Sequence, residues 1–170
     1  MNSYVPRMVR LSCFGAILFF SMGACAENKV SGTLNLGKEK VVIKYAYVDE
    51  TQPSEPVVVL SDQPLPATAI PFIPEKLVDE MKINAVVFSV SAKDKAMTNS
   101  FGMLYLPGHG GVGLGRVEDG NEKLTIKQLD ASVMEGNIAT TKVNDIVSSI
   151  PPYSFDLNFS VELGKGRSKP

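Results

Sequence analysis

The segment from Tyr153 to Leu163 constrains the fold more than any other part of the chain. In it, six apolar residues alternate with five polar residues in an unbroken period of two. A period of two places successive side chains on opposite faces of a β-strand. The segment therefore predicts a half-buried strand with an apolar inner face and a polar outer face, as in an antiparallel sheet.

Further strands are predicted wherever apolar residues alternate or β-branched and aromatic residues are enriched between turn-forming residues. They are expected at 30–36, 41–48, 57–60, 85–90, 101–106, 123–129 and 131–141. The first two form a hairpin with a short glycine-containing loop. Polar turns are expected over 92–100 and 118–121. Gly136, within the last of these strands, indicates a β-bulge or a close approach between backbones.

A proline-rich stretch interrupts this series of strands. Four prolines between residues 64 and 74 exclude a central strand there, so 61–74 is expected to cross the domain in an extended form. Pro74 suits the first turn of a helix, and the apolar residues that follow it share one helical face. One short helix is therefore predicted over 74–82.

About eight strands, one short helix and turns at roughly 8–12-residue spacing predict an all-β fold. The uneven crossovers at 61–74 and 143–152 favour an antiparallel β-sandwich of immunoglobulin-like or Greek-key type. A small β-barrel is the alternative. No linker divides the chain, so a single domain is expected over 27–163, followed by a flexible basic tail over 164–170.

Residues 1–26 have the pattern of an export signal. Arg7 and Arg10 supply a basic start, and an apolar run over 11–22 follows that is too short to span a bilayer. Small residues over 23–26 then offer two cleavage sites. The localisation expected from this pattern is the periplasm or the outside of the cell.

The two cleavage sites differ in what happens to Cys25. An Ala-x-Ala pattern predicts a cut before Glu27, which removes the cysteine and is slightly favoured. Residues 22–25 instead resemble a bacterial lipobox, with Met where Leu is usual, and a cut before Cys25 would attach a lipid to its thiol. That lipid would be the only membrane attachment expected. Either cut leaves no free thiol, which excludes a cysteine nucleophile, a disulfide and a thiolate metal site.

His109 is the single histidine and lies in a glycine-rich stretch over 107–115. A general base needs a positioned partner, and no Gly-x-Ser-x-Gly elbow is present. An exposed loop residue is therefore preferred over a catalytic one. The glycines do not precede a helical pattern, so a loop or a glycine-rich strand edge is favoured over a phosphate site. One histidine without cysteines also argues against a zinc site, and no metal is expected.

Tyr45 and Tyr47 share one face of their predicted strand and could form a stacking platform for a sugar or a peptide, although core packing is favoured. The acidic residues around 49–55 and 118–119 could supply oxygens to calcium. Without an EF-hand pattern they are interpreted as solvated turn charges. A formal net charge of −1 and the lack of a basic stripe argue against nucleic acid as a partner.

The expected function is therefore that of an exported, non-enzymatic β domain. It would act as a periplasmic or surface binding module for an envelope protein or a small ligand, without a cofactor. His109, Tyr45 and Tyr47 are the candidate ligand contacts, and Cys25 is the candidate lipidation site. The alternative is a small secreted hydrolase that uses His109 with a nearby carboxylate or serine.

Overall fold

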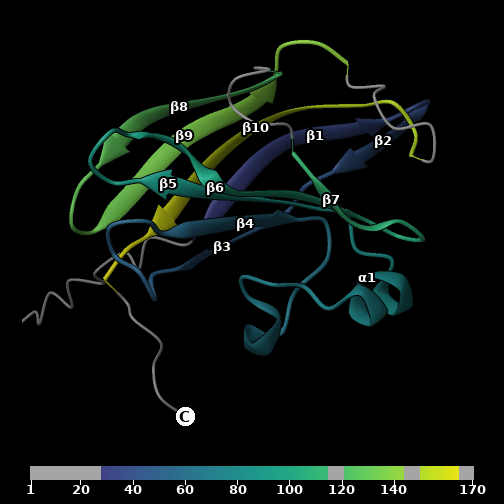
Figure 1. The fold of residues 1–170 in the computed structure, drawn as a ribbon, viewed down its shortest axis with the longest axis horizontal. Coiled ribbons are helices and arrows are strands. Elements are labelled where there is room, and N and C mark those ends of the chain that lie inside the picture. The colour runs from purple at the N-terminus through teal and green to yellow at the C-terminus, as the bar shows by residue number, and fades with distance from the viewer. Residues whose placement is uncertain (1–27, 115–120, 144–149, 165–170) are drawn as a thin grey trace, which may run out of the picture.

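The computed structural model describes residues 28–114, 121–143 and 150–164. Its strands form two antiparallel five-stranded sheets that face each other and do not close into a barrel (Figure 1). The expected all-β sandwich is therefore confirmed. The predicted export signal, the turn around 118–120 and most of the tail and of the 143–152 crossover lie outside the described residues.

Each sheet has its own set of strands. The first sheet, in the order β2-β1-β10-β9-β8, contains β1 (Lys29–Leu36), β2 (Glu39–Val42), β8 (Glu122–Leu129), β9 (Val133–Thr140) and β10 (Tyr153–Glu162). The second sheet, in the order β3-β4-β5-β6-β7, contains β3 (Tyr45–Asp49), β4 (Val57–Ser61), β5 (Ala85–Ser91), β6 (Ala96–Leu106) and β7 (Gly110–Gly113).

Most strands pair with the strand that precedes or follows them in the sequence. Neighbouring strands are consecutive in sequence, except that β1 pairs with β10. The proline-rich crossover was expected to make a Greek-key connection, but it leaves β4 and returns to the adjacent strand β5 of the same sheet. The chain changes sheets between β2 and β3 and again between β7 and β8.

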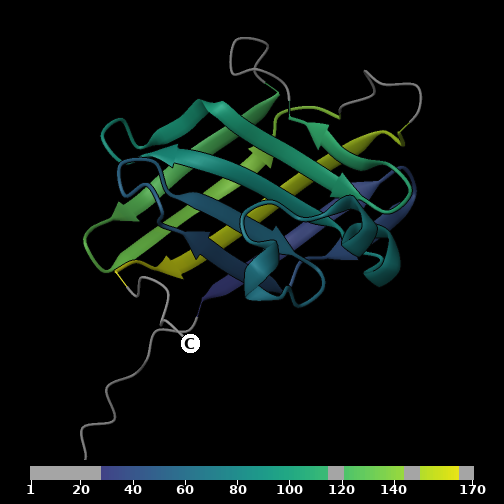
Figure 2. The same ribbon diagram turned by 60° about the horizontal axis from the view of Figure 1, so that its bottom comes forward.

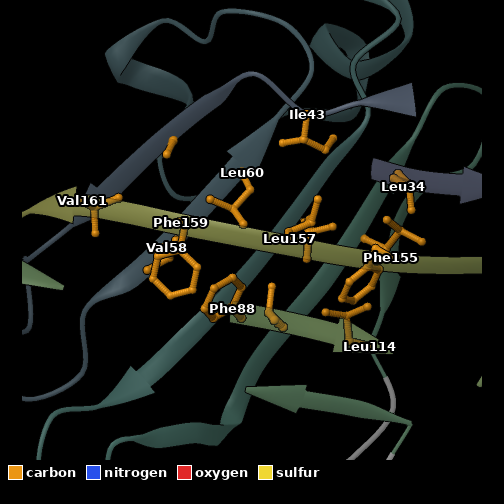
Figure 3. Packing of buried hydrophobic residues seen from close by; sticks show 14 of the residues in the cluster. Leu34, Ile43, Val58, Leu60, Phe88, Leu114, Phe155, Leu157, Phe159 and Val161 are labelled. Carbon is orange, nitrogen blue, oxygen red and sulfur yellow. The ribbon is translucent and has the colours of Figure 1, made fainter. Parts of the chain in front are cut away.

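The alternation that predicted β10 is confirmed. Its burial alternates along the strand, and it lies in the middle of the first sheet, bonded to β1 and β9. The inner residues meet the second sheet in one core, where Phe88 and Phe159 pack edge to face with ring centroids 5.5 Å apart (Figure 3). The inner face of β10 is therefore buried between the sheets.

The central strands of the second sheet, β4 and β5, are buried on both faces. Residues 62–84, here called the strap, include the 3-10 turn Ala67–Ala69 and helix α1 (Glu75–Met81), and they lie over its outer face (Figure 2). A second apolar cluster forms between sheet and strap from Val59, Leu65, Ile73, Val78, Ile83, Ala85, Val87 and Tyr105. Burial on both faces explains the continuous apolar runs of β4 and β5. Helix α1 lies within the predicted 74–82.

Two strand predictions need correction. The expected strand 41–48 is divided at Ile43, which is 1% exposed where the chain passes from one sheet to the other. The expected turn 92–100 is shorter, because β6 begins at Ala96 after a register shift in its pairing with β5. The glycine-rich stretch, expected as a loop or a glycine-rich strand edge, contributes the edge strand β7. With the division at Ile43 and the addition of β7, the described residues contain ten strands, against about eight expected.

The close approach predicted at Gly136 is confirmed. Gly136 pairs with Phe159 of β10, and a Cβ atom on it would lie 2.9 Å from Phe159 Cζ and 2.8 Å from the carbonyl oxygen of Thr125. The register of β8 against β9 also shifts between Ile126 and Gln128. The missing side chain therefore makes room for an aromatic ring and a neighbouring backbone.

Candidate functional site

A hollow of about 450 Å³ opens on the outer face of the second sheet, between the β3–β4 loop and the strap. It combines carboxylate, hydroxyl, amide, aromatic and aliphatic groups. The residues that line it are Asp49, Thr51, Gln52, Glu55, Val57, Pro71, Phe72 and Ser89. They come from the end of β3, the loop after it, the start of β4, the strap and β5.

The β3–β4 loop forms the polar wall of the hollow and is held by backbone bonds to the end of β5. The N–H of Val90 donates to the carbonyl of Pro56 at 3.0 Å, and the N–H of Ala92 donates to that of Ser54 at 3.0 Å. At the start of the loop, Asp49 Oδ1 accepts from Thr51 N at 3.2 Å and from Thr51 Oγ1 at 2.6 Å. This turn directs the chain away from the sheet.

A chain of hydroxyl groups connects the loop to the sheet. Thr98 Oγ1 of β6 donates to Glu55 Oε1 at 2.5 Å. Because that bond uses the single Thr98 hydroxyl proton, the Ser89 hydroxyl is the donor in its hydrogen bond to Thr98. Ser89 is 1% exposed. These two hydrogen bonds therefore satisfy the buried Ser89 hydroxyl and fix the Glu55 carboxylate at the edge of the hollow.

The strap forms the apolar wall. Phe72 is 66% exposed, whereas the next residue, Ile73, is 4% exposed and packs on the sheet. The peptide between Ile70 and Pro71 is cis. Burial of Ile73 thus leaves the Phe72 ring at the mouth of the hollow, where it offers an aromatic surface to a ligand.

The charges around the hollow are of one sign. Asp49 and Glu55 contribute carboxylates to its wall, and Glu50 lies between two lining residues in sequence. No lysine, arginine or histidine is among the described residues that line it. The arrangement therefore favours a ligand with a positive group and an apolar part.

His109, a predicted ligand contact, lies exposed in the β6–β7 turn, where its backbone N–H donates to the carbonyl of Leu106 at 3.0 Å. Across the described part of the chain, its imidazole makes no hydrogen bond and no ion pair. Tyr105, just before this turn, pairs with Ala85, whereas the hollow lies at the Ser89 end of β5. The carboxylate or serine partner that the hydrolase alternative requires is thus not found among the described residues.

Tyr45 and Tyr47 share the outer face of the second sheet, as predicted, but do not act as one surface. Tyr47 packs under the strap, and its hydroxyl oxygen accepts a bond from the N–H of Leu65 at 2.9 Å. Tyr45 is 38% exposed. Neither residue lines the hollow. The structure therefore gives Tyr47 a role in holding the strap.

Sequence reasoning did not single out Phe72, whose position between Pro71 and Ile73 carried no distinguishing pattern. It considered the carboxylates near residues 49–55 as calcium ligands but interpreted them as solvated turn charges. The described ranges contain no group of three or more His, Cys, Asp or Glu side chains that could hold a metal ion. Cys25 lies outside these ranges. No helix within them has the length and apolarity needed to cross a membrane.

The fold and the hollow define a class, an antiparallel β-sandwich with a strap over one sheet and an acidic, partly aromatic depression beside that strap. Comparison with known proteins adds no relative, since no protein-family model, no curated protein and no solved structure matches this chain significantly.

Proposed function

We propose that this protein is an exported, non-enzymatic binding module whose hollow takes a small ligand with a cationic group and an apolar group. The observation that carries this proposal is the hollow itself, which is lined by the exposed Phe72 together with the carboxylates of Asp49 and Glu55. Its volume of about 450 Å³ falls within the roughly 300–1,000 Å³ of small-molecule sites.

The lining suits an amine more than a neutral ligand. A cation above an aromatic face is attracted by the negative charge of the ring, and Phe72 supplies such a face. Asp49 uses only its Oδ1 atom in the turn with Thr51, so Oδ2 is available to a ligand. Val57 and Pro71 provide the apolar floor.

Binding is favoured over catalysis because the polar groups here stabilise the loop. The Ser89 hydroxyl is buried and donates to Thr98, which in turn donates to Glu55. A nucleophile would instead need an exposed oxygen and a base that accepts its proton. The function of this hydroxyl chain is therefore to hold the binding wall.

Export is the part of the proposal that rests on residues 1–26 alone. Intact-mass spectrometry of protein from native membrane and soluble fractions tests it. A start at Glu27 supports a free secreted or periplasmic domain, and a lipidated Cys25 supports a membrane-attached one. A full-length chain beginning at Met1 in both fractions would overturn export.

Ligand chemistry is tested with three matched probes, the cation 2-phenylethylamine, the neutral 2-phenylethanol and the anion 3-phenylpropionate. Titration followed by backbone amide shifts should move Thr51 and Phe72 with the amine and much less with the other two. Phe72→Ala and Asp49→Asn should each weaken amine binding by about three- to tenfold, as the loss of one cation contact implies.

Tyr45→Ala is the matched control, because it removes an exposed aromatic residue of the same sheet that does not line the hollow. It should leave amine binding unchanged. Equal binding of all three probes, or equal loss with Tyr45→Ala and Phe72→Ala, would contradict the proposed site.

A further inference from the structure

The floor of the hollow includes a single row of residues that runs across three strands of the second sheet. Asp49 of β3 lies opposite Val57 of β4, and Val57 lies opposite Ser89 of β5. All three residues line the hollow. Residues directly opposite each other in an antiparallel pair share one face of the sheet. The row therefore has Asp49 at one end, Val57 in the middle and Ser89 at the other end.

The carboxylate of Glu55 lies at the Ser89 end of this row. Its Oε1 atom accepts from Thr98 Oγ1 at 2.5 Å, and the Ser89 hydroxyl donates to the same Thr98 oxygen. The backbone leads in the same direction, because the N–H of Val90 in β5 donates to the carbonyl of Pro56, the residue after Glu55, at 3.0 Å. The two carboxylates of the hollow are thus on opposite sides of Val57.

The strand spacing gives the approximate distance between these two charges. Neighbouring strands lie about 4.7–4.9 Å apart, so β3 and β5 are about 10 Å apart. Two cationic nitrogens, each about 2.8 Å from one carboxylate, would then be separated by roughly 5–9 Å. Between the two ends, Val57 provides an apolar floor, and the exposed ring of Phe72 lies at the mouth.

Both carboxylates can accept a further hydrogen bond. Asp49 uses Oδ1 in the turn with Thr51, which leaves Oδ2 for a ligand. A carboxylate offers about four acceptor positions, so the bond from Thr98 does not exhaust Glu55. No lysine, arginine or histidine is among the described residues that line the hollow. Two separated negative charges therefore suit a ligand with two separated positive charges.

We propose that the ligand of the hollow is an aliphatic α,ω-diamine with about three to six carbon atoms between its nitrogens, as the separation of roughly 5–9 Å requires. One ammonium group binds Asp49, the other binds Glu55, and the methylene chain lies over Val57. Alkylamines are protonated at neutral pH, as lysine is, so such a molecule is a dication. The inference rests on the proposed function, because it names the ligand class of the same hollow.

The second ammonium group should add a modest amount of affinity. The hollow is open to solvent, where each ion pair is weak and is screened by salt. A diamine should therefore bind about three- to tenfold more tightly than a monoamine of the same carbon number. This advantage should shrink as the salt concentration rises.

Titration of the purified full chain with α,ω-diamines of two to ten carbon atoms, each beside its matched monoamine, tests the spacing. Affinity should be greatest at about three to six carbon atoms. The amide signals of Thr51 and Phe72 should move on binding. An affinity that is independent of length or rises steadily with it, or diamines that bind no better than monoamines, would overturn the inference.

Isosteric variants test the two ends separately. Asp49→Asn and Glu55→Gln remove one charge each but keep the oxygen atoms that accept hydrogen bonds in the turn and from β6. Each variant should lower diamine affinity to the monoamine level and abolish the length optimum. Glu39→Gln with Glu80→Gln changes two exposed carboxylates outside the hollow and is the control. An equal loss in this control would show general charge attraction and overturn the inference.

The monoamine 2-phenylethylamine distinguishes this inference from the proposed function. If it binds at the hollow and no diamine is preferred over its monoamine, the diamine site is wrong and the amine-binding function stands. If neither 2-phenylethylamine nor any diamine moves the Thr51 and Phe72 signals, both proposals fail.

Discussion

Gly164 and Glu50, although 114 residues apart, are joined by a bifurcated hydrogen bond from the Gly164 N–H to both carboxylate oxygens. This bond connects the end of β10, in the first sheet, to the β3–β4 loop beside the second sheet. The bond therefore joins the first sheet to the loop that contributes residues to the hollow. The bond is exposed to solvent. Its loss should therefore affect the segments around Gly164 and Glu50 and change the free energy of unfolding of the whole protein only slightly.

Glu50→Ala should accelerate amide hydrogen exchange at Gly164, because the variant removes the acceptor of its N–H. The free energy of unfolding should change by less than about 1 kcal/mol, as expected for an exposed charged acceptor. Exchange followed by nuclear magnetic resonance measures the first effect and urea unfolding the second. Glu39→Ala is the control, and unchanged exchange at Gly164 in Glu50→Ala would disprove the bond.

Gly136→Ala should destabilise the fold by about 1–3 kcal/mol, because its Cβ would lie 2.8 Å from the Thr125 carbonyl oxygen and 2.9 Å from the Phe159 ring. Gly113→Ala is the matched control. A Cβ at Gly113 meets nothing within 4 Å, so this variant should be near neutral. The shift in urea midpoint measures both, and equal shifts would contradict the packing described at Gly136.

Tyr47→Phe should destabilise the protein by about 0.5–1.5 kcal/mol, because the N–H of Leu65 loses its acceptor. Faster amide exchange at Leu65 should accompany the loss. Tyr45→Phe removes a hydroxyl from the same face of the same strand and should change neither quantity. Loss of stability in both variants alike would show that Tyr47 has no special role in holding the strap.

Phe88→Ala and Phe159→Ala should each cost about 3–5 kcal/mol, because both residues are buried in the core between the sheets (Figure 3). The edge-to-face contact, with centroids 5.5 Å apart, predicts a coupling of about 0.5–1.5 kcal/mol in a double-mutant cycle. Phe→Leu variants keep the fold measurable if the alanine variants unfold. Strictly additive losses would contradict a direct interaction between the rings.

Stability should depend on pH through Asp130. The Gln128 side chain, together with donors from Ser132 and Val133, holds the pKa of the Asp130 carboxyl well below its ordinary value of 3.8. A lowered folded-state pKa means that the stabilisation is present above the ordinary value and is lost as pH falls below it. Urea midpoints measured from about pH 4 downward should therefore fall more steeply in the parent than in Asp130→Asn. Ser132→Ala should lie between them, and identical slopes in all three would refute the prediction.

Local patterns in the sequence predicted those parts of the fold that depend on neighbouring residues. The period of two was sufficient to predict β10 and its inner face, because that strand is central in its sheet and covered on one face only. The apolar runs of β4 and β5 indicated burial, and Pro74 indicated the start of a helix. The close approach at Gly136 was also predicted from a local pattern, since a glycine within a strand indicates that another group comes near the backbone.

Tertiary structure alone decided where the chain changes sheets and which residues meet at the hollow. A strand pattern over 41–48 does not show that Ile43 passes between sheets, because the separation depends on partners such as Ser61, whose carbonyl accepts from the N–H of Lys44. Phe72 and Glu55 come together only when the strap lies over the second sheet. Periodicity is encoded within a few residues, whereas a binding hollow depends on packing between segments distant in the chain. The sequence by itself therefore determined the β class and its inner faces, and long-range packing determined the site.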